Sequence, residues 1–318
     1  MKSKIKLRKK IRLLLSIILV IIVSYTTIIL FKNYQNSNYN FFIPTFNETI
    51  TEQSRKLEEL HYSSDEIKII TKNVSEENIN YLIENKIIKT SVVNIIKEKY
   101  FIDKYLKDYI NFYNSNQNKK YSEIISIINT HSNDNENKII TDTSKDKFTI
   151  INKYYYVDKN YPKEDTLVSI DSQYHLNNTE TKINKETYEA FLKMYEAAPN
   201  DSKFKIKNAY ISYQVQEATH NIDPNNNNES YAKQGYSEHQ TGYALDLESN
   251  EWLKENAYKY GFILRYPKDK EELTGYPYSK EHYRYCGITC ATYIYENNIT
   301  FDEYYEYFVK FNNPNNLS

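Results

Sequence analysis

The 318-residue sequence has few of the residues that break regular structure or cross-link chains: five glycines, seven prolines and two cysteines. So little glycine and proline excludes a collagen-like or Pro/Gly-rich low-complexity protein. Two cysteines are too few for the repeated pairs of a structural zinc site. The formal net charge of −1 gives no reason to expect a nucleic-acid partner. The length allows one or two domains with a sizeable core.

The two cysteines, Cys286 and Cys290, lie at an expected junction between a strand and a helix. An exported protein can oxidise such a pair, but the junction leaves the geometry of a bridge undefined. We therefore expect two small, buried side chains.

The first 31 residues have the charge pattern of a membrane anchor. Residues 1–12 carry seven positive charges and no acid, and Leu13–Phe31 follows without any charge. In a helix this run spans roughly 28 Å, close to the hydrocarbon core of a bilayer. The alternative, a cleaved signal peptide, normally has a shorter apolar region that ends at small residues. The basic flank predicts a single-pass protein of the cell membrane, with a cytoplasmic N-terminus and the rest of the chain extracellular.

Residues 32–145 have the pattern of a helical region with polar breaks. Ser75 is a candidate N-cap, and Ile79, Leu82 and Ile83 follow at helical spacing. This region contains no constellation of catalytic or metal-binding residues. We therefore expect a helical spacer or a substrate-presenting subdomain.

From residue 149 to residue 310, helices alternate with short segments of strand character. A helix is expected after Asn184, which is a candidate cap. Strands are expected in the segments 204–213, 243–247, 262–266 and 282–286. The sequence therefore predicts an α+β domain with a small antiparallel sheet and flanking helices.

Among the six histidines, His239 and His282 stand out because of their neighbours. A hydrolytic zinc site needs three protein ligands and an open position for water. The spacing of His239 and Asp246 suits one ligand on a loop, a glycine-containing turn, and a second ligand on a strand. Alternation along that strand places Ala244 and Asp246 on one face, and His282 opens a later strand. The residues alone also allow a simple ion pair between Asp246 and Arg284.

A specific resemblance is carried by the segment Gly235–Glu248, GYSEHQTGYALDLE, and by the later segments WLKENAYKYGFILRYPKDKEELTGYPY and HYRYCG. The S-x-H-x-x-G-x-A-x-D pattern resembles that of VanY-type D-alanyl-D-alanine carboxypeptidases, which are zinc peptidases. The resemblance implies a zinc D,D-peptidase fold, with Zn²⁺ bound by His239, Asp246 and His282. It also implies hydrolysis of the terminal D-Ala-D-Ala bond of peptidoglycan stem peptides.

Two positions depart from the family pattern. The family has a glutamate as general base three residues before its last ligand, where this chain has Ser279. We predict that Glu281 acts as the base instead, which requires an irregular chain before His282, because successive strand residues point to opposite faces. Glu248 is a second candidate, if the strand of Asp246 continues that far. The family also has an arginine that positions the substrate, and this chain has Ile211 at that place.

Three further residues are predicted to bind substrate. Ser212 and Gln216 are retained from the family motif around the lost arginine, and Ser237 precedes the first ligand, where it is equally suited to a turn.

These features allow three functional interpretations. The first is a membrane-anchored, wall-facing zinc D,D-carboxypeptidase. The second is a catalytically impaired zinc-bearing domain that binds stem peptides or a wall-enzyme partner, because the ligands are kept while the catalytic helpers are lost. The third is a related peptidase that cleaves another bond. The position of the nearest glutamate carboxylate relative to the zinc ligands separates the first two.

Overall fold

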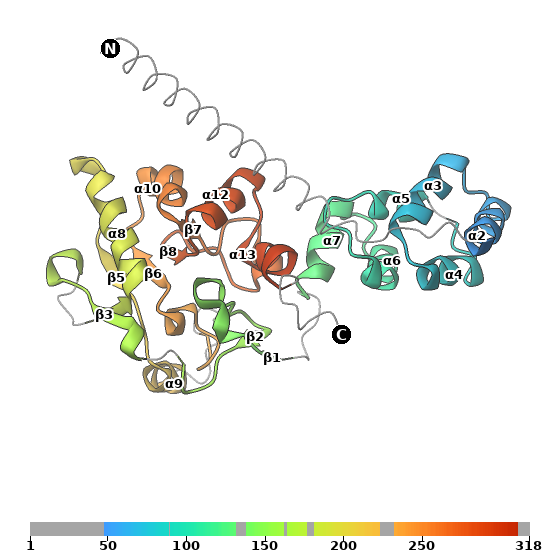
Figure 1. The fold of residues 1–318 in the computed structure, drawn as a ribbon. Coiled ribbons are helices and arrows are strands. Elements are labelled where there is room, and N and C mark those ends of the chain that lie inside the picture. The colour runs from blue at the N-terminus through green and yellow to red at the C-terminus, as the bar shows by residue number, and fades with distance from the viewer. Residues whose placement is uncertain are drawn as a thin grey trace, which may run out of the picture. The chain divides into compact units, whose positions relative to one another are not determined.

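The computed structural model describes residues 48–88, 90–131, 138–161, 164–176, 181–222 and 232–310 (Figure 1). The expected tail and membrane anchor, residues 1–31, lie outside the described part of the chain. None of the helices within the described part is long and apolar enough to cross a membrane.

The chain divides into two compact units, residues 1–125 and 126–318. This division falls earlier than the predicted start of the peptidase domain at residue 149. The second unit includes the end of a helix that the sequence placed in the spacer, because Ser126 Oγ donates a hydrogen bond of 2.6 Å to the Glu303 carboxylate.

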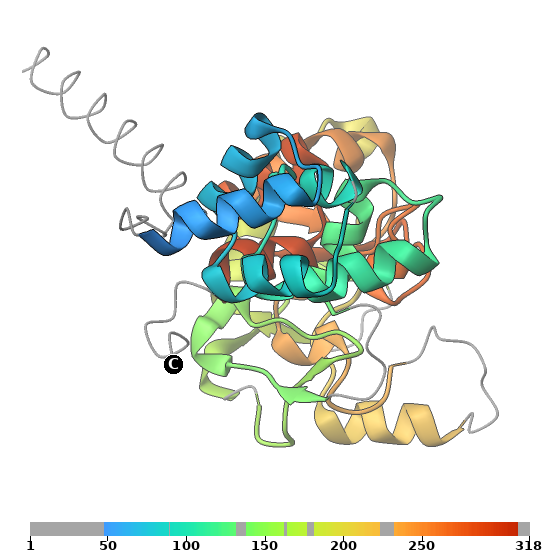
Figure 2. The same ribbon diagram turned by 90° about the vertical axis from the view of Figure 1, so that its right-hand side faces the viewer.

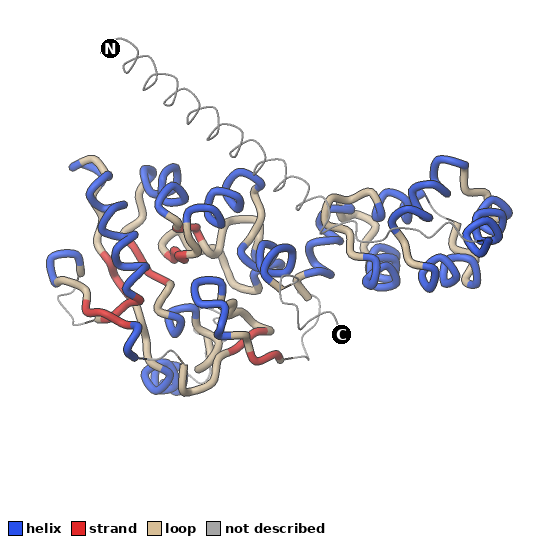
Figure 3. Tube along the Cα trace, in the orientation of Figure 1, coloured by secondary structure: helices blue, strands red, loops and turns tan. Residues whose placement is uncertain are grey.

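The first unit is helical in its described part, as predicted (Figure 3). Ser63 and Glu66 form a capping box at the start of one helix, and Ser75 caps the next one as expected. The helices are α2 (Glu48–Glu59), α3 (Ser64–Asn73), α4 (Glu76–Glu84), α5 (Thr90–Ile96), η1 (Asp103–Tyr105), α6 (Leu106–Ser115) and α7 (Tyr121–Asn129), which continues into the second unit. The apolar stripes of α2 to α6 meet in a buried cluster that includes Leu57, Ile70 and Leu82.

The second unit mixes helices with short strands, so the prediction of an α+β fold is confirmed. Its strands are β1 (Ile139–Ile140), β2 (Tyr155–Tyr156), β3 (Leu167–Ser169), β4 (Lys182–Asn184), β5 (Ile206–Asn208), β6 (Ala244–Leu247), β7 (Phe262–Leu264) and β8 (His282–Tyr285). Its α-helices are α8 (Lys185–Ala197), α9 (Tyr213–Ile222), α10 (Glu251–Asn256), α11 (Glu271–Thr274), α12 (Ile288–Asn297) and α13 (Phe301–Tyr304). Short helical turns are η2 (Thr143–Phe148), η3 (Glu164–Thr166), η4 (Ser172–Tyr174), η5 (Asn200–Ser202), η6 (Glu238–Thr241), η7 (Ala257–Tyr260) and η8 (Tyr305–Val309). Figures 1 and 2 both show α9 at the periphery of this unit.

The four-stranded sheet that carries the candidate site has the order β5-β6-β8-β7, and each neighbouring pair is antiparallel. Side chains alternate between its two faces. Leu245 and Tyr283 point to one face, where they pack with Phe191 of α8 in the main buried cluster. Asp246 and His282 are directly opposite one another in the register and share the other face. We call this second side the metal face.

Gly242 ends η6 and permits the tight turn into β6. Its φ of +71° lies in the left-handed region, which favours glycine. A Cβ at this position would lie 2.9 Å from Leu167 Cδ2 and 3.3 Å from the backbone nitrogen of Asn184. The glycine therefore allows β3 and β4 to approach the turn that joins the first two predicted ligands.

The cysteines are free and buried at the end of β8 and in α12. Cys286 and Cys290 are at most 1% exposed, which confirms the expectation of two small packed side chains.

Candidate metal centre

His239, Asp246 and His282 converge, although η6, β6 and β8 contribute them separately. Nε2 of His239 lies 3.1 Å from Oδ2 of Asp246, and Nδ1 of His282 lies 2.8 Å from Oδ1 of the same carboxylate. One donor atom from each residue falls within 4.8 Å of the others. The structure therefore brings together all three residues that the sequence predicts as ligands.

The donor set fits a zinc ion. Two imidazole nitrogens and a carboxylate are common zinc ligands, and donors around a tetrahedral zinc lie roughly 3.3 Å apart. The two measured separations from the Asp246 carboxylate are close to that spacing. The imidazole nitrogens also meet at a single carboxylate, so one cation placed there would satisfy all three groups.

The protonation states of Asp246 and His282 suit metal binding, whereas the Asp246 carboxylate outweighs burial and raises the pKa of His239. Burial disfavours the charged form of Asp246, but the two imidazoles outweigh this effect and hold the pKa of its carboxyl below the ordinary value. Burial lowers the pKa of His282, and the neighbouring His239 lowers it further. An ionised carboxylate and a neutral imidazole are the ligand forms that a divalent metal requires.

A β-bulge shapes the neighbouring strand, β5. Ile206 pairs with Leu247 and lies in the core, while Asn208 pairs with Asp246, so Lys207 is an extra residue on this strand. Alternation from Ile206 places Lys207 on the metal face. Asn208 lies on the same face, because its Nδ2 donates a 2.9 Å hydrogen bond to Oδ2 of Asp246. The bulge thus places two consecutive polar side chains on the metal face, and Asn208 contacts a ligand there.

His282 is also held by Tyr266, whose ring stacks on the imidazole with a centroid distance of 4.9 Å. Neither Asn208 nor Tyr266 was identified from the sequence. Strict alternation from Ile206 would place Asn208 in the core, so the bulge hides Asn208 from an assignment based on alternation.

The metal face also carries a network of buried charges, since Arg284 is two residues from His282 on β8 and pairs with Ala244. Glu238, next to His239, accepts a hydrogen bond of 2.9 Å from Arg265 Nε and another from Arg284 Nη1. Arg265 also donates to Asp302 at 2.6 and 3.0 Å. These four side chains are at most 1% exposed, and their two positive and two negative charges cancel. Arg284 therefore pairs with Glu238, and the simple alternative in which it pairs with Asp246 is wrong.

Glu238 is ionised in this environment. Burial raises the pKa of its carboxyl, but the Arg284 and Arg265 guanidiniums outweigh burial and hold the pKa below its ordinary value. Removing the charge would leave two buried guanidiniums with a single carboxylate.

We expect Glu238→Gln to lower the free energy of unfolding by about 3 to 5 kcal/mol, the usual cost of breaking a buried ion pair. Urea unfolding followed by the fluorescence of Trp252 would measure it. Trp252 is the only tryptophan of the sequence and stacks on Phe204 in the second unit, so it reports on this unit. The experiment is done with a chelator, because bound metal would add its own stabilisation.

The matched control is Glu251→Gln, which removes the same charge from an exposed ion pair with Lys254. It should change the free energy of unfolding by at most about 1 kcal/mol. An equal loss of unfolding free energy in the two variants would contradict the expectation that the buried ion pairs stabilise the fold more than the exposed pair does.

The structure places the two predicted bases differently. Glu248 lies beyond the end of β6, and its carboxylate accepts a 2.9 Å hydrogen bond from the backbone nitrogen of Lys205. Glu281 lies in a bend before β8, so strand alternation from His282 does not fix its direction. Its carboxylate lies 2.8 Å from Lys207 Nζ and is 31% exposed. Since Lys207 is on the metal face, Glu281 is the better placed of the two glutamates.

The predicted substrate-binding residues also stabilise local backbone. Ser212 Oγ accepts a hydrogen bond from Val215 N at the start of α9, and Gln216 Nε2 donates to the carbonyl of Ala232 at 2.7 Å. Ser237 is buried immediately before η6. Their roles toward a substrate stay a prediction.

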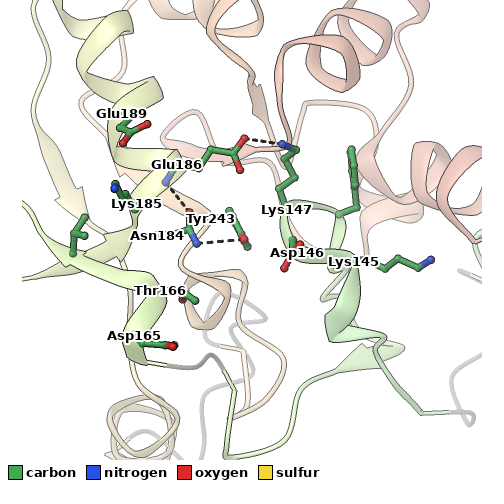
Figure 4. Close-up of a pocket in the computed structure, with 12 residues that line it drawn as sticks. Lys145, Asp146, Lys147, Asp165, Thr166, Asn184, Lys185, Glu186, Glu189 and Tyr243 are labelled. Carbon is green, nitrogen blue, oxygen red and sulfur yellow. Dashed lines mark hydrogen bonds and ion pairs between the residues drawn. The ribbon is translucent and has the colours of Figure 1, made fainter.

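A pocket of about 680 Å³ lies between η2, the start of α8 and Tyr243 (Figure 4). Tyr243 belongs to the cluster on the helix-covered face of the sheet, opposite to the metal face. One ion pair lines this pocket, in which Lys147 Nζ lies 2.6 Å from Glu186 Oε1. The pocket is therefore separate from the candidate metal centre.

Comparison with known proteins identifies relatives of this chain. Residues 180–288 match the family model described as VanY: D-alanyl-D-alanine carboxypeptidase. The chain is 33% identical over 180 residues to the putative carboxypeptidase YodJ of Bacillus subtilis, covering 49% of this chain and 66% of that protein. It is 32% identical over 219 residues to a D-alanyl-D-alanine carboxypeptidase of Enterococcus faecium, covering 62% of this chain and 70% of the relative.

Among solved structures, the chain is similar to the LdcB LD-carboxypeptidase, with 34% identity and a TM-score of 0.46 over 51% of this chain and 86% of the other. It is also similar to a VanY D,D-pentapeptidase from a VanB-type resistance cassette, solved in complex with Zn(II). That match has 26% identity and a TM-score of 0.42 over 50% of this chain and 98% of the other.

Proposed function

Since the chain belongs to the VanY family of D-alanyl-D-alanine carboxypeptidases, we propose that it is a zinc-dependent peptidase that removes the terminal D-alanine of peptidoglycan stem peptides. The observation that carries this proposal is the convergence of His239, Asp246 and His282 on one face of the sheet. Glu281, whose carboxylate lies 2.8 Å from Lys207 Nζ, would supply the base that hydrolysis needs.

The proposed mechanism assigns a role to each group. A zinc ion held by the two histidines and Asp246 would supply a Lewis acid that activates water and polarises the scissile carbonyl. Glu281 accepts the proton of the attacking water at its carboxylate and passes it to the leaving amine of D-alanine. Asn208 and Tyr266 keep Asp246 and His282 in position through the hydrogen bond and ring contact described above.

We propose further that the peptidase unit faces the cell wall and is attached to the membrane by Leu13–Phe31. The charge-free run and its basic flank support this arrangement, and it would place the site beside its polymeric substrate.

A second candidate function is a zinc-bearing domain that binds stem peptides without cleaving them. Ser279, at the family's base position, offers no carboxylate, and Ile211 offers no cation. Glu281 is moreover engaged by Lys207. These observations favour binding without turnover if Lys207 holds Glu281 permanently.

The test uses residues 32–318, loaded with Zn²⁺ and incubated with a stem pentapeptide that ends in D-Ala-D-Ala. Release of D-alanine is followed by mass spectrometry, with His239→Ala as the control. Release that requires zinc and disappears in the control supports the peptidase. Bound zinc and bound peptide without release would instead establish the binding domain for this substrate.

A further inference from the structure

A carboxypeptidase must distinguish a free terminal carboxylate from a chain that continues, and in proteins a cation usually makes that distinction. We propose that Lys207 binds the terminal carboxylate of the substrate, exchanging its bond to Glu281 for a bond to the incoming peptide. The inference rests on the proposed function and adds a residue that sets its specificity.

The position of Lys207 supports this role. The bulge in β5 places it on the metal face next to Asn208, whose amide contacts the Asp246 ligand. Its side chain is 31% exposed, so a ligand entering from solvent can reach the ammonium group. An exposed cation one residue from a contact to a metal ligand is suited to hold the end of a short substrate.

The two arginines near the site already form buried ion pairs. Arg265 and Arg284 have fully buried side chains and donate to Glu238, and Arg265 also donates to Asp302. Freeing either guanidinium would leave buried carboxylates without their partners, which is strongly unfavourable. Neither arginine can therefore serve as the carboxylate anchor.

The ion pair between Lys207 and Glu281 can be replaced by an ion pair between Lys207 and the substrate. Both of its side chains are 31% exposed, and pairs with this exposure contribute little to stability. A substrate carboxylate can replace Glu281 at Lys207 without a large loss. The exchange frees the Glu281 carboxylate from the ammonium group, so that it can take a proton while the substrate is bound.

The test compares two stem pentapeptides, one ending in free D-Ala-D-Ala and the other in D-Ala-D-Ala amide. They are given to the zinc-loaded parent, Lys207→Met, Lys207→Arg and Lys205→Met. The last variant is the matched control, because Lys205 is an exposed lysine whose bonds to Glu248 run through its backbone. Zinc content and the Trp252 unfolding curve are recorded for every variant.

We expect Lys207→Met to raise KM for the acid-ended peptide about 10- to 100-fold, the effect of losing a charge-assisted hydrogen bond. KM for the amide-ended peptide should not change, so the preference for the free acid disappears. Lys207→Arg should restore most of it, and Lys205→Met should match the parent. Unchanged KM for the acid-ended peptide, or an equal rise for both peptides, would overturn the role of Lys207. So would a change in kcat alone.

The design separates this inference from the proposed function. If the parent binds the acid-ended peptide but does not cleave it, the peptidase proposal fails for this substrate. The ratio of the two dissociation constants, measured by calorimetry, still decides the role of Lys207. A parent that neither binds nor cleaves the peptide overturns both proposals.

Discussion

Replacing His282 with alanine is expected to lower zinc affinity by more than about 100-fold and to abolish release of D-alanine. Loss of a group that merely supports a ligand already costs about 10- to 100-fold in metal affinity, and His282 supplies one of three protein donors. Zinc content after dialysis against a competing chelator measures the first effect. Mass spectrometry of the released D-alanine measures the second.

The control for this substitution is His175→Ala. His175 is a buried histidine of the same unit, 2% exposed, and it is not part of the donor cluster. Its removal should affect stability but leave zinc content near that of the parent. If both variants lost zinc equally, the metal would depend on the folded state of the unit in general, and the ligand assignment would fail.

Glu281→Gln is expected to lower kcat for D-alanine release by about 10² to 10⁴-fold, the usual contribution of a general base. The amide keeps the shape of the side chain but cannot accept the proton of the attacking water. Zinc content should be unchanged, because Glu281 is not one of the three converging donors. Steady-state rates with the stem pentapeptide, normalised to bound zinc, give the measurement.

Glu248→Gln is the matched variant, because Glu248 is the other glutamate considered as the base. Its carboxylate is bonded to the backbone nitrogen of Lys205, so we expect little loss of activity. A large loss in Glu248→Gln together with normal activity in Glu281→Gln would reverse the assignment of the base.

The elements of the second unit were largely predictable, because their signals are local. Asn184 caps α8, and Thr300 and Glu303 form a capping box, as the spacing of these residues indicates. Alternation in β6 correctly assigns Ala244 and Asp246 to one face of the strand, because β6 is regular. The three ligands were found through such local spacing together with the family resemblance.

The contacts around the ligands could not be predicted in the same way. The roles of Lys207 and Asn208 depend on a bulge, and one extra residue reverses the faces that alternation assigns. The direction of Glu281 depends on a bend that has no strand periodicity. The pairing of Glu238 with Arg265 and Arg284 joins positions 27 and 46 residues apart. No local sequence pattern indicates a pairing between residues so far apart in the chain.

The charge balance of the buried network around Glu238 has an evolutionary consequence. A chain that exchanged Glu238 for a neutral residue would keep two guanidiniums in its interior with only Asp302 to oppose them. Each single step away from the present arrangement therefore passes through a destabilised intermediate. Among diverging descendants, Glu238, Arg265, Arg284 and Asp302 should be inherited or replaced together, even in lineages where turnover has been lost.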